Sequence, residues 1–170
     1  SVLELTDAIV RDTEPRADGR RGRGIDVSGA STCSLSRTWV ARSVEAGLSV
    51  DGAGTTLDVR DVVVDDTAAD IDGVGARGVG LQSQADALIE RASISGSAGF
   101  GLLAADGATV RAYDVAVRST GWRPDGLRGR AVNVDLAATL LLERALLIGS
   151  QGTGLYAQDD GTIVQATDLV

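Results

Sequence analysis

The chain has 170 residues, of which 44% are hydrophobic and only 3% aromatic, and it carries a formal net charge of −8. This length suits a single domain over residues 1–170, with a core built from Val, Leu, Ile and Ala. The acidic balance argues against a general nucleic-acid binder, and no apolar run is long enough to span a bilayer. We therefore expect neither a nucleic-acid partner nor membrane insertion.

A repeat with a step of about 54 residues dominates the sequence. Apolar residues recur at this step in two interleaved columns, Leu3, Leu57, Val110 and Val164 in the first and Cys33, Ala87 and Leu140 in the second. The interval between columns alternates between about 30 and about 24 residues, so odd and even units differ and one cassette holds two units. Such a chain is a stack of similar units that bury their core against one another. Both ends fall inside the pattern, so we expect a segment of a longer protein.

Each even unit contains three short stretches of alternating apolar and polar residues, separated by turn residues. We expect strands over 33–35, 38–40 and 48–50, over 87–89, 92–94 and 102–104, and over 140–142, 145–147 and 155–157. Such strands are too short for a meander, and propeller blades need four strands in about 40 residues. A parallel β-helix fits, with each unit forming one rung about 4.8 Å above the last.

The order within a unit is two apolar pairs around a two-residue turn, then Ser or Thr, then Gly before an alternating strand. This order resembles the right-handed parallel β-helix of the pectate-lyase-like superfamily over essentially the whole chain. The resemblance implies an all-β solenoid with six to seven rungs of three short strands. It implies no single function, because the superfamily includes lyases, hydrolases, epimerases, phage tailspikes and surface adhesins.

Two polar columns accompany the apolar ones. At the two-residue turn, acid and base alternate through Asp7, Arg37, Asp61, Arg91, Asp114, Arg144 and Asp168. We interpret this column as an ion-pair ladder in which each Arg lies between two Asp neighbours. A hydroxyl column holds Thr13, Ser43, Thr67, Ser97, Thr120 and Ser150. We expect these hydroxyls to bond to backbone groups of their own or the next unit.

Odd units owe their extra length to loops over residues 14–23, 68–77 and 121–130, which we expect to project from one side of the rod. Each loop contains an Asp-Gly pair, at Asp18, Asp72 and Asp125, and each ends with an Arg, at Arg23, Arg77 and Arg130. One interpretation is turn chemistry, with the Arg tying the loop closed. The other is a row of acid–Arg pairs flanking a groove for an anionic polysaccharide. Trp122 would then stack on a sugar ring, with Arg123, Arg128 and Tyr156 as further ligand-binding candidates.

The Gly-led strand beside these loops is the face on which the enzymes of this superfamily carry their catalytic groups. Its first outward column is predicted to hold Asp26, Ser49, Gly80, Leu103, Asn133 and Tyr156. The second is predicted to hold Ser28, Asp51, Gln82, Ala105, Asp135 and Gln158. Glycoside hydrolysis needs two carboxyl groups about 5–9.5 Å apart, which makes Asp26, Asp51 and Asp135 the catalytic candidates. Neither column offers a carboxylate nest for Ca²⁺, so we expect no metal and no cofactor. The acidic run Asp65, Asp66, Asp70 and Asp72 is interpreted as solvated charge, with weak Ca²⁺ binding as the alternative.

Regular cassettes and neutralised ladders favour a non-catalytic scaffold or a carbohydrate-binding, adhesin-like segment of a secreted or cell-surface protein. The alternative is a polysaccharide lyase or glycoside hydrolase that acts on an anionic polysaccharide. The partner in either case is a polysaccharide or a cell-surface glycan. Open strand edges at both ends of the rod also predict end-to-end self-association.

Overall fold

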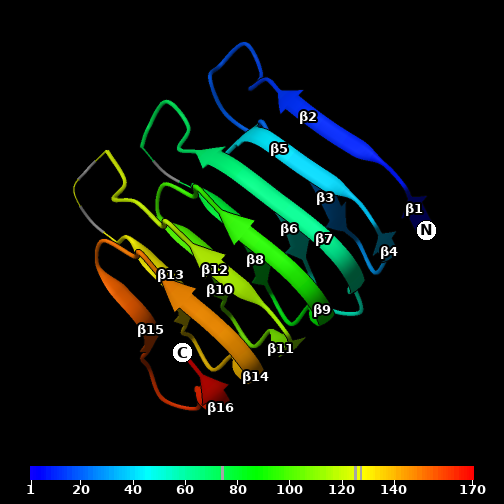
Figure 1. Cartoon of the computed structure of the whole chain (residues 1–170). Coiled ribbons are helices and arrows are strands. Elements are labelled where there is room, and N and C mark those ends of the chain that lie inside the picture. The colour runs from blue at the N-terminus through cyan, green and yellow to red at the C-terminus, as the bar shows by residue number, and fades with distance from the viewer. Residues whose placement is uncertain (74, 125, 127) are drawn as a thin grey trace.

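The computed structural model describes residues 1–73, 75–124, 126 and 128–170, and within these ranges the chain forms strands and no helix. The strands assemble into a ten-stranded sheet, here sheet A, and a six-stranded sheet, here sheet B, which lies behind sheet A in Figure 1. Sheet A contains β1 (Val2–Thr6), β2 (Ile9–Thr13), β4 (Thr32–Ser36), β5 (Trp39–Val44), β7 (Thr56–Ala68), β9 (Asp86–Ser95), β11 (Thr109–Tyr113), β12 (Ala116–Arg118), β14 (Thr139–Ile148) and β16 (Ile163–Leu169). Sheet B contains β3 (Ile25–Ser28), β6 (Ala46–Asp51), β8 (Arg77–Gln82), β10 (Phe100–Ala104), β13 (Arg130–Val134) and β15 (Thr153–Ala157).

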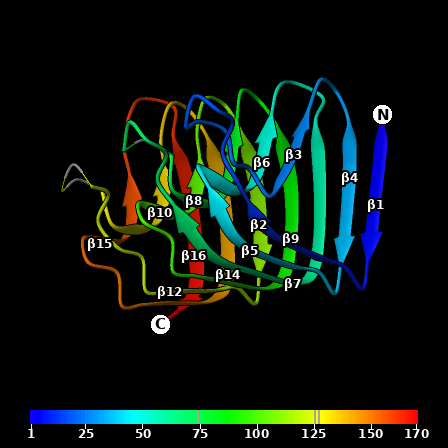
Figure 2. The ribbon, with the colours of Figure 1, turned by 90° about the horizontal axis from the view of Figure 1, so that it is seen from above.

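Every pairing between these strands is parallel, and each strand pairs with the equivalent strand of the next unit. Leu3 pairs with Cys33, Cys33 with Leu57, and Leu57 with Ala87. The same column continues through Val110, Leu140 and Val164. The predicted apolar columns are therefore confirmed as stacked contacts, and the all-β class and the parallel strands are confirmed with them. Successive units follow one another from β1 to β16 in Figure 2, an arrangement consistent with a β-solenoid.

The core lies between the two sheets because alternate side chains of each strand point inward. Leu35 and Ile89 of sheet A and Leu48, Leu81 and Leu102 of sheet B are fully buried members of one apolar cluster. Cys33 belongs to the same cluster, as expected from its column, and burial raises the pKa of its thiol to about 11. No helix in the described ranges has the length and apolarity needed to cross a membrane.

The strands of sheet A depart from the expected three short strands per unit. β7, β9 and β14 run without interruption through the two-residue turn and reach 13, 10 and 10 residues. Asp61, Arg91 and Arg144 take left-handed φ values of 55°, 52° and 53° there, and interstrand pairing resumes directly after each. A single left-handed residue bends the strand without ending its ladder, so two predicted strands become one.

The hydroxyl column also differs from its prediction. Ser43, Thr67 and Ser97 are buried, and within the described residues their hydroxyl oxygens have no hydrogen-bond partner. They face the glycines that open the strands of sheet B. A Cβ on Gly47, for example, would overlap Cγ1 of Val64 and lie 2.7 Å from the carbonyl oxygen of Gly78. The column therefore needs small side chains because the backbone opposite comes so close.

Candidate functional site

The outer face of sheet B and the three loops above it form the candidate site. Side chains that point away from the core lie in register along this face. The first column runs through Asp26, Ser49, Gly80, Leu103, Asn133 and Tyr156. A parallel column runs through Ala46, Arg77, Phe100, Arg130 and Thr153. The register therefore places candidate site residues of adjacent units side by side and keeps those of distant units apart.

The three long loops share one tight turn. The amide of Gly19 donates to the carbonyl of Arg16 at 2.8 Å, and that of Gly73 donates to Asp70 at 3.0 Å. Both glycines have positive φ, 78° and 72°, which an Asp-Gly turn favours. The turn-chemistry interpretation of the Asp-Gly pairs is therefore supported for the first two loops. Asp125 of the third loop lies outside the described residues.

The loops also contact one another. Arg20 of the first loop donates to Asp72 of the second at 2.7 and 2.6 Å, and Ile71 packs against Gly19. Nε of Arg123 in the third loop donates to the carbonyl of Gly73 at 2.9 Å. All three loops lie on one side of the molecule in Figure 1. They form a stacked layer rather than separate projections.

The Arg residues that end the loops reach along sheet B rather than closing their own loops. Arg23 donates from Nε and Nη2 to Oε1 of Glu45 at 3.0 and 2.5 Å and from Nη1 to Asp26 at 3.0 Å. Arg77 donates to Oε1 of Gln82 at 2.5 Å and reaches the same Glu45 oxygen at 3.4 Å. Burial lowers the pKa of Arg77, whereas for Arg23 the bonds to Glu45 and Asp26 outweigh desolvation and raise it.

Glu45 was not among the sequence-based candidates, although it is the buried acid that two of them share. Only 7% of its surface is exposed. It has a left-handed φ of 74° and lies against Gly75, where a Cβ would overlap it. The sequence signal was a lone Glu directly before the apolar Ala46-led strand, a place where a charged side chain needs a partner.

A second polar network covers the later part of sheet B. Nη1 of Arg130 donates to Oδ1 of Asn133 at 2.5 Å, and Nδ2 of Asn133 donates to Oδ2 of Asp135 at 2.9 Å. The guanidinium carbon of Arg130 lies 3.5 Å from the centre of the Tyr156 ring. The Tyr156 hydroxyl donates to Gln158 at 2.6 Å. One face of Tyr156 is therefore already occupied, which leaves its other face and its edge for a ligand.

The three candidate acids are not gathered at one point. Asp26 and Asp51 lie on adjacent strands, β3 and β6, and both are exposed. Asp135 follows β13, which β8 and β10 separate from β6. Within the described residues no group of three or more Cys, Asp or Glu is placed to hold a metal ion.

Trp122 remains exposed, with 47% of its surface accessible, and its ring packs beside Gly129 at the base of the third loop. Its amide donates to Oε1 of Gln151 at 2.9 Å, which fixes the backbone of the loop on the next unit. The exposed indole is therefore carried by a backbone segment that is bonded to the next unit.

The fourth unit interrupts the polar face with apolar residues. Phe100, Leu103 and Ala105 form a small cluster of their own on the outside of sheet B, separate from the main core. The guanidinium carbon of Arg128 lies 5.3 Å from the centre of the Phe100 ring. Together with Gln82, Asp135 and Leu136 these residues line a shallow pocket of about 160 Å³. Sequence reasoning assigned no role to this break, although Leu103 and Ala105 stand out in otherwise mostly polar columns.

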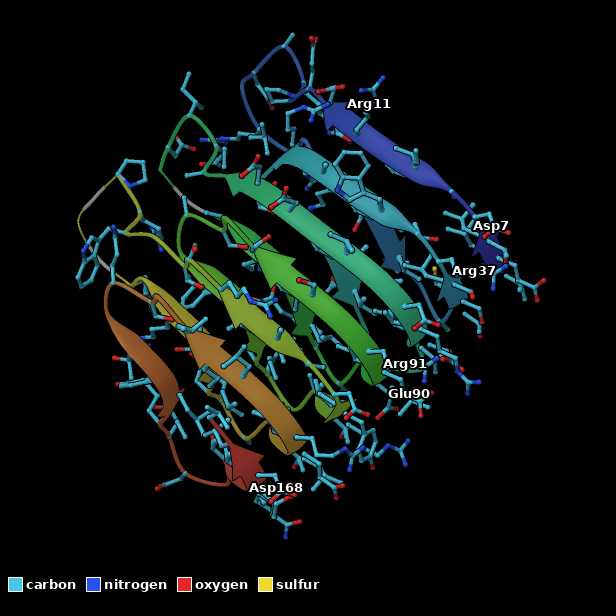
Figure 3. All side chains as sticks on the ribbon, in the orientation of Figure 1. Asp7, Arg11, Arg37, Glu90, Arg91 and Asp168 are labelled. Carbon is cyan, nitrogen blue, oxygen red and sulfur yellow. The ribbon has the colours of Figure 1, made fainter. Side chains whose placement is uncertain are left out.

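The charged ladder at the two-residue turn forms a second polar surface. Arg37 donates from Nε and Nη2 to the two oxygens of Asp7 at 2.6 and 2.9 Å, beside each other in Figure 3. Equivalent two-bond pairs join Arg91 to Asp61 and Arg144 to Asp114. Of its two neighbours in the ladder, each of these Arg residues therefore bonds to the Asp of the preceding unit and acts on the Asp of the next unit through space. These hydrogen bonds lower the pKa of Asp7, Asp61 and Asp114.

No protein-family model matches the chain, and no curated protein matches it. The function is therefore inferred from the geometry of the site.

Proposed function

We propose that the chain is a segment of a right-handed parallel β-helix, with six full rungs and a partial seventh, that serves as a non-catalytic carbohydrate-binding rod in a secreted or cell-surface protein. The glycan would lie along the outer face of sheet B, beneath the stacked loops. The handedness, the rung number and the kinship with pectate-lyase-like proteins belong to this proposal.

One observation carries the proposal: four charged side chains of this face, Arg23, Asp26, Glu45 and Arg77, are bonded to one another in a supporting network. Arg23 and Arg77 share Glu45, and Asp26 is held by Arg23. The carboxylates of Asp26 and Glu45 are thus both engaged in holding the surface. A rigid surface with polar groups already positioned suits binding, because little side-chain freedom is lost when a ligand arrives.

Exposed aromatic groups supply the contact that a saccharide needs. The indole of Trp122 is exposed, and the half-buried Tyr156 lies on the face with Arg130 stacked on one side. Aromatic rings pack against the C–H face of a sugar, while neighbouring amides and guanidinium groups bond its hydroxyls.

The test is a glycan-array screen of the 170-residue chain, with and without Ca²⁺, followed by a product-release assay on each glycan bound. Binding without turnover is expected, and Trp122→Ala should weaken it while Trp39→Ala, on sheet A, should not. Turnover would replace the proposal with the alternative, a polysaccharide lyase or glycoside hydrolase. Asp26→Asn and Asp51→Asn would then be the first variants to assay. An array without any bound glycan would reject carbohydrate binding and leave a spacer role.

A further inference from the structure

The fourth unit carries a feature that the other units lack on the same face. In the column of Phe100 the other occupants include Arg77 and Arg130, and in the column of Leu103 they include Ser49 and Asn133. The three apolar side chains of the fourth unit on this face are themselves buried by their neighbours, and the cluster they form borders a small pocket that is open to solvent.

From this break we propose a subsite for one neutral pyranose unit of a polysaccharide, with Leu103 and Ala105 as its floor and Gln82, Arg128 and Asp135 as its polar wall. The inference rests on the proposed carbohydrate-binding function and specifies where on the rod a sugar ring is recognised and which class of sugar it is.

The dimensions of the pocket suit a single ring. Its volume of about 160 Å³ is well below the roughly 300–1,000 Å³ of sites that enclose drug-sized ligands. The pocket is shallow and lies on the surface of the rod, so a polymer can place one unit in it while its neighbours continue along the face. A free metabolite would need a more enclosed site to bury most of its surface.

The chemistry of the lining matches a sugar. A pyranose ring has an apolar C–H face and a rim of hydroxyls that both donate and accept hydrogen bonds. Phe100, Leu103 and Ala105 supply an apolar base that is almost entirely shielded from solvent. Around it, Arg128 and the Gln82 amide donate and Asp135 accepts. Oε1 of Gln82 already accepts from Arg77, which orients the amide and leaves its NH₂ group as the donor.

The charges of the lining favour a neutral sugar over an acidic one. Of the residues that line the pocket, Arg128 and Asp135 are charged, and their charges are opposite. A uronate bound there would bring its carboxylate close to Asp135, which cancels the attraction of Arg128. Arg128 makes a loose contact with Phe100, at 5.3 Å from the ring centre, near the limit for a cation–π contact. A ligand hydroxyl can therefore draw the guanidinium off the Phe100 ring.

The test uses the full 170-residue chain labelled with ¹³C at its methyl groups and observed by NMR. The probes are three neutral tetrasaccharides, of glucose in α and in β linkage and of mannose, and one tetramer of a uronic acid. We expect at least one neutral probe to shift the methyl signals of Leu103 and Ala105, and the uronate to bind at least about tenfold more weakly.

Two variants with matched controls locate the contact. Ala105→Gln places in the fourth unit the side chain that Gln82 has in the third, so the backbone accepts it while the pocket is filled. Its control is Ser28→Gln in the same column at β3. Arg128→Ala removes a wall residue, and its control is Arg21→Ala, the equivalent position of the first loop. We expect each pocket variant to weaken neutral-probe binding about tenfold or more, and neither control to change it.

The outcomes separate this proposal from the one on which it rests. Neutral binding that Ala105→Gln leaves intact would place the sugar elsewhere on the rod, which overturns the subsite but not carbohydrate binding. A preference for the uronate would also overturn the neutral subsite. If none of the four probes binds while the array finds another glycan, the subsite is rejected and the binding function stands. Failure of both experiments rejects both proposals.

Discussion

Replacing Glu45 by Gln should destabilise the fold, because the neutral side chain leaves two largely buried guanidinium groups without their shared counter-charge. The side chains of Glu45, Arg23 and Arg77 are only 10%, 23% and 14% exposed. Gln retains the shape of Glu, and its amide oxygen can still accept from Arg23, so the change isolates the charge.

The expected cost follows from this burial. Removing one partner of a fully buried ion pair costs roughly 3–5 kcal/mol, because the remaining charge stays desolvated. The residual exposure of Arg23 allows partial resolvation, so we expect a loss of about 2–3 kcal/mol in the free energy of unfolding. For a domain of this size about 1 kcal/mol changes the Tm by roughly 2–4 °C, which predicts a decrease of about 4–12 °C.

Urea denaturation followed by circular dichroism measures the change, with Glu143→Gln as the control. Glu143 is an acid on β14 of sheet A that also contacts an Arg, but this contact with Arg144 is long, 3.5 Å, and half of the Arg144 side chain is exposed. A second variant, Glu45→Gln with Arg23→Gln, should recover part of the loss, because it removes one of the two buried guanidinium groups that lack their counter-charge. If Glu45→Gln and Glu143→Gln have the same denaturation midpoint, Glu45 does not anchor the face of sheet B.

Three further predictions address the ladder, the glycine column and the core. Arg91→Gln should lower the denaturation midpoint at pH 7, and its difference from the wild type should vanish in acid. The folded-state pKa of Asp61 is held below its ordinary 3.8, so its stabilisation is present above that pH and is lost as the pH falls through the folded pKa. A difference that persists when Asp61 is protonated would contradict the ladder. Gly47→Ala should cost about 1–3 kcal/mol by overpacking. Gly154→Ala, in the same column with nothing within 4 Å of the added Cβ, should be nearly neutral, and equal midpoints would refute the close approach. Cys33 should resist a thiol reagent at pH 7 until the chain is unfolded, because burial raises its pKa to about 11; rapid labelling of the native protein would show an open core.

The register of the fold was predictable from sequence because it depends on properties that a residue carries by itself. Apolar residues such as Leu57 and Ala87 recur at a fixed step, and a one-residue slip would expose every one of them. The glycines that open the strands of sheet B are also visible in the sequence. They indicate where the backbone comes close to neighbouring parts of the chain. The strand boundaries were less predictable, because Asp61 and Arg91 lie within continuous strands in a left-handed conformation that non-glycine residues seldom adopt.

The side-chain contacts of the site were harder to predict because they depend on which neighbour a long side chain selects. Arg37 has an acid on each side in the ladder, and the alternating sequence is symmetric between them, yet Asp7 accepts two hydrogen bonds from Arg37 and Asp61 acts on it only through space. Glu45 was overlooked for a similar reason. Its importance comes from the burial that Arg23, Arg77 and the second loop together create, and none of these has a fixed spacing from it.

The polar contacts divide the rod into two-unit cassettes and then join those cassettes through the loops. The ladder pairs at Arg37, Arg91 and Arg144 all connect an odd unit to the even unit after it. Cassettes are linked on sheet A by Thr56 with Thr32 and by Arg118 with Ser93, and elsewhere by three further contacts: Glu45 with Arg77, Arg20 with Asp72, and Arg123 with the Gly73 carbonyl. All three of these links involve the long loops or the Arg that ends one. The loops therefore hold adjacent cassettes in register at the same place where they border the face of sheet B. A surface held in this way keeps its side chains positioned before any ligand arrives, as the proposed binding of a polysaccharide along this face requires.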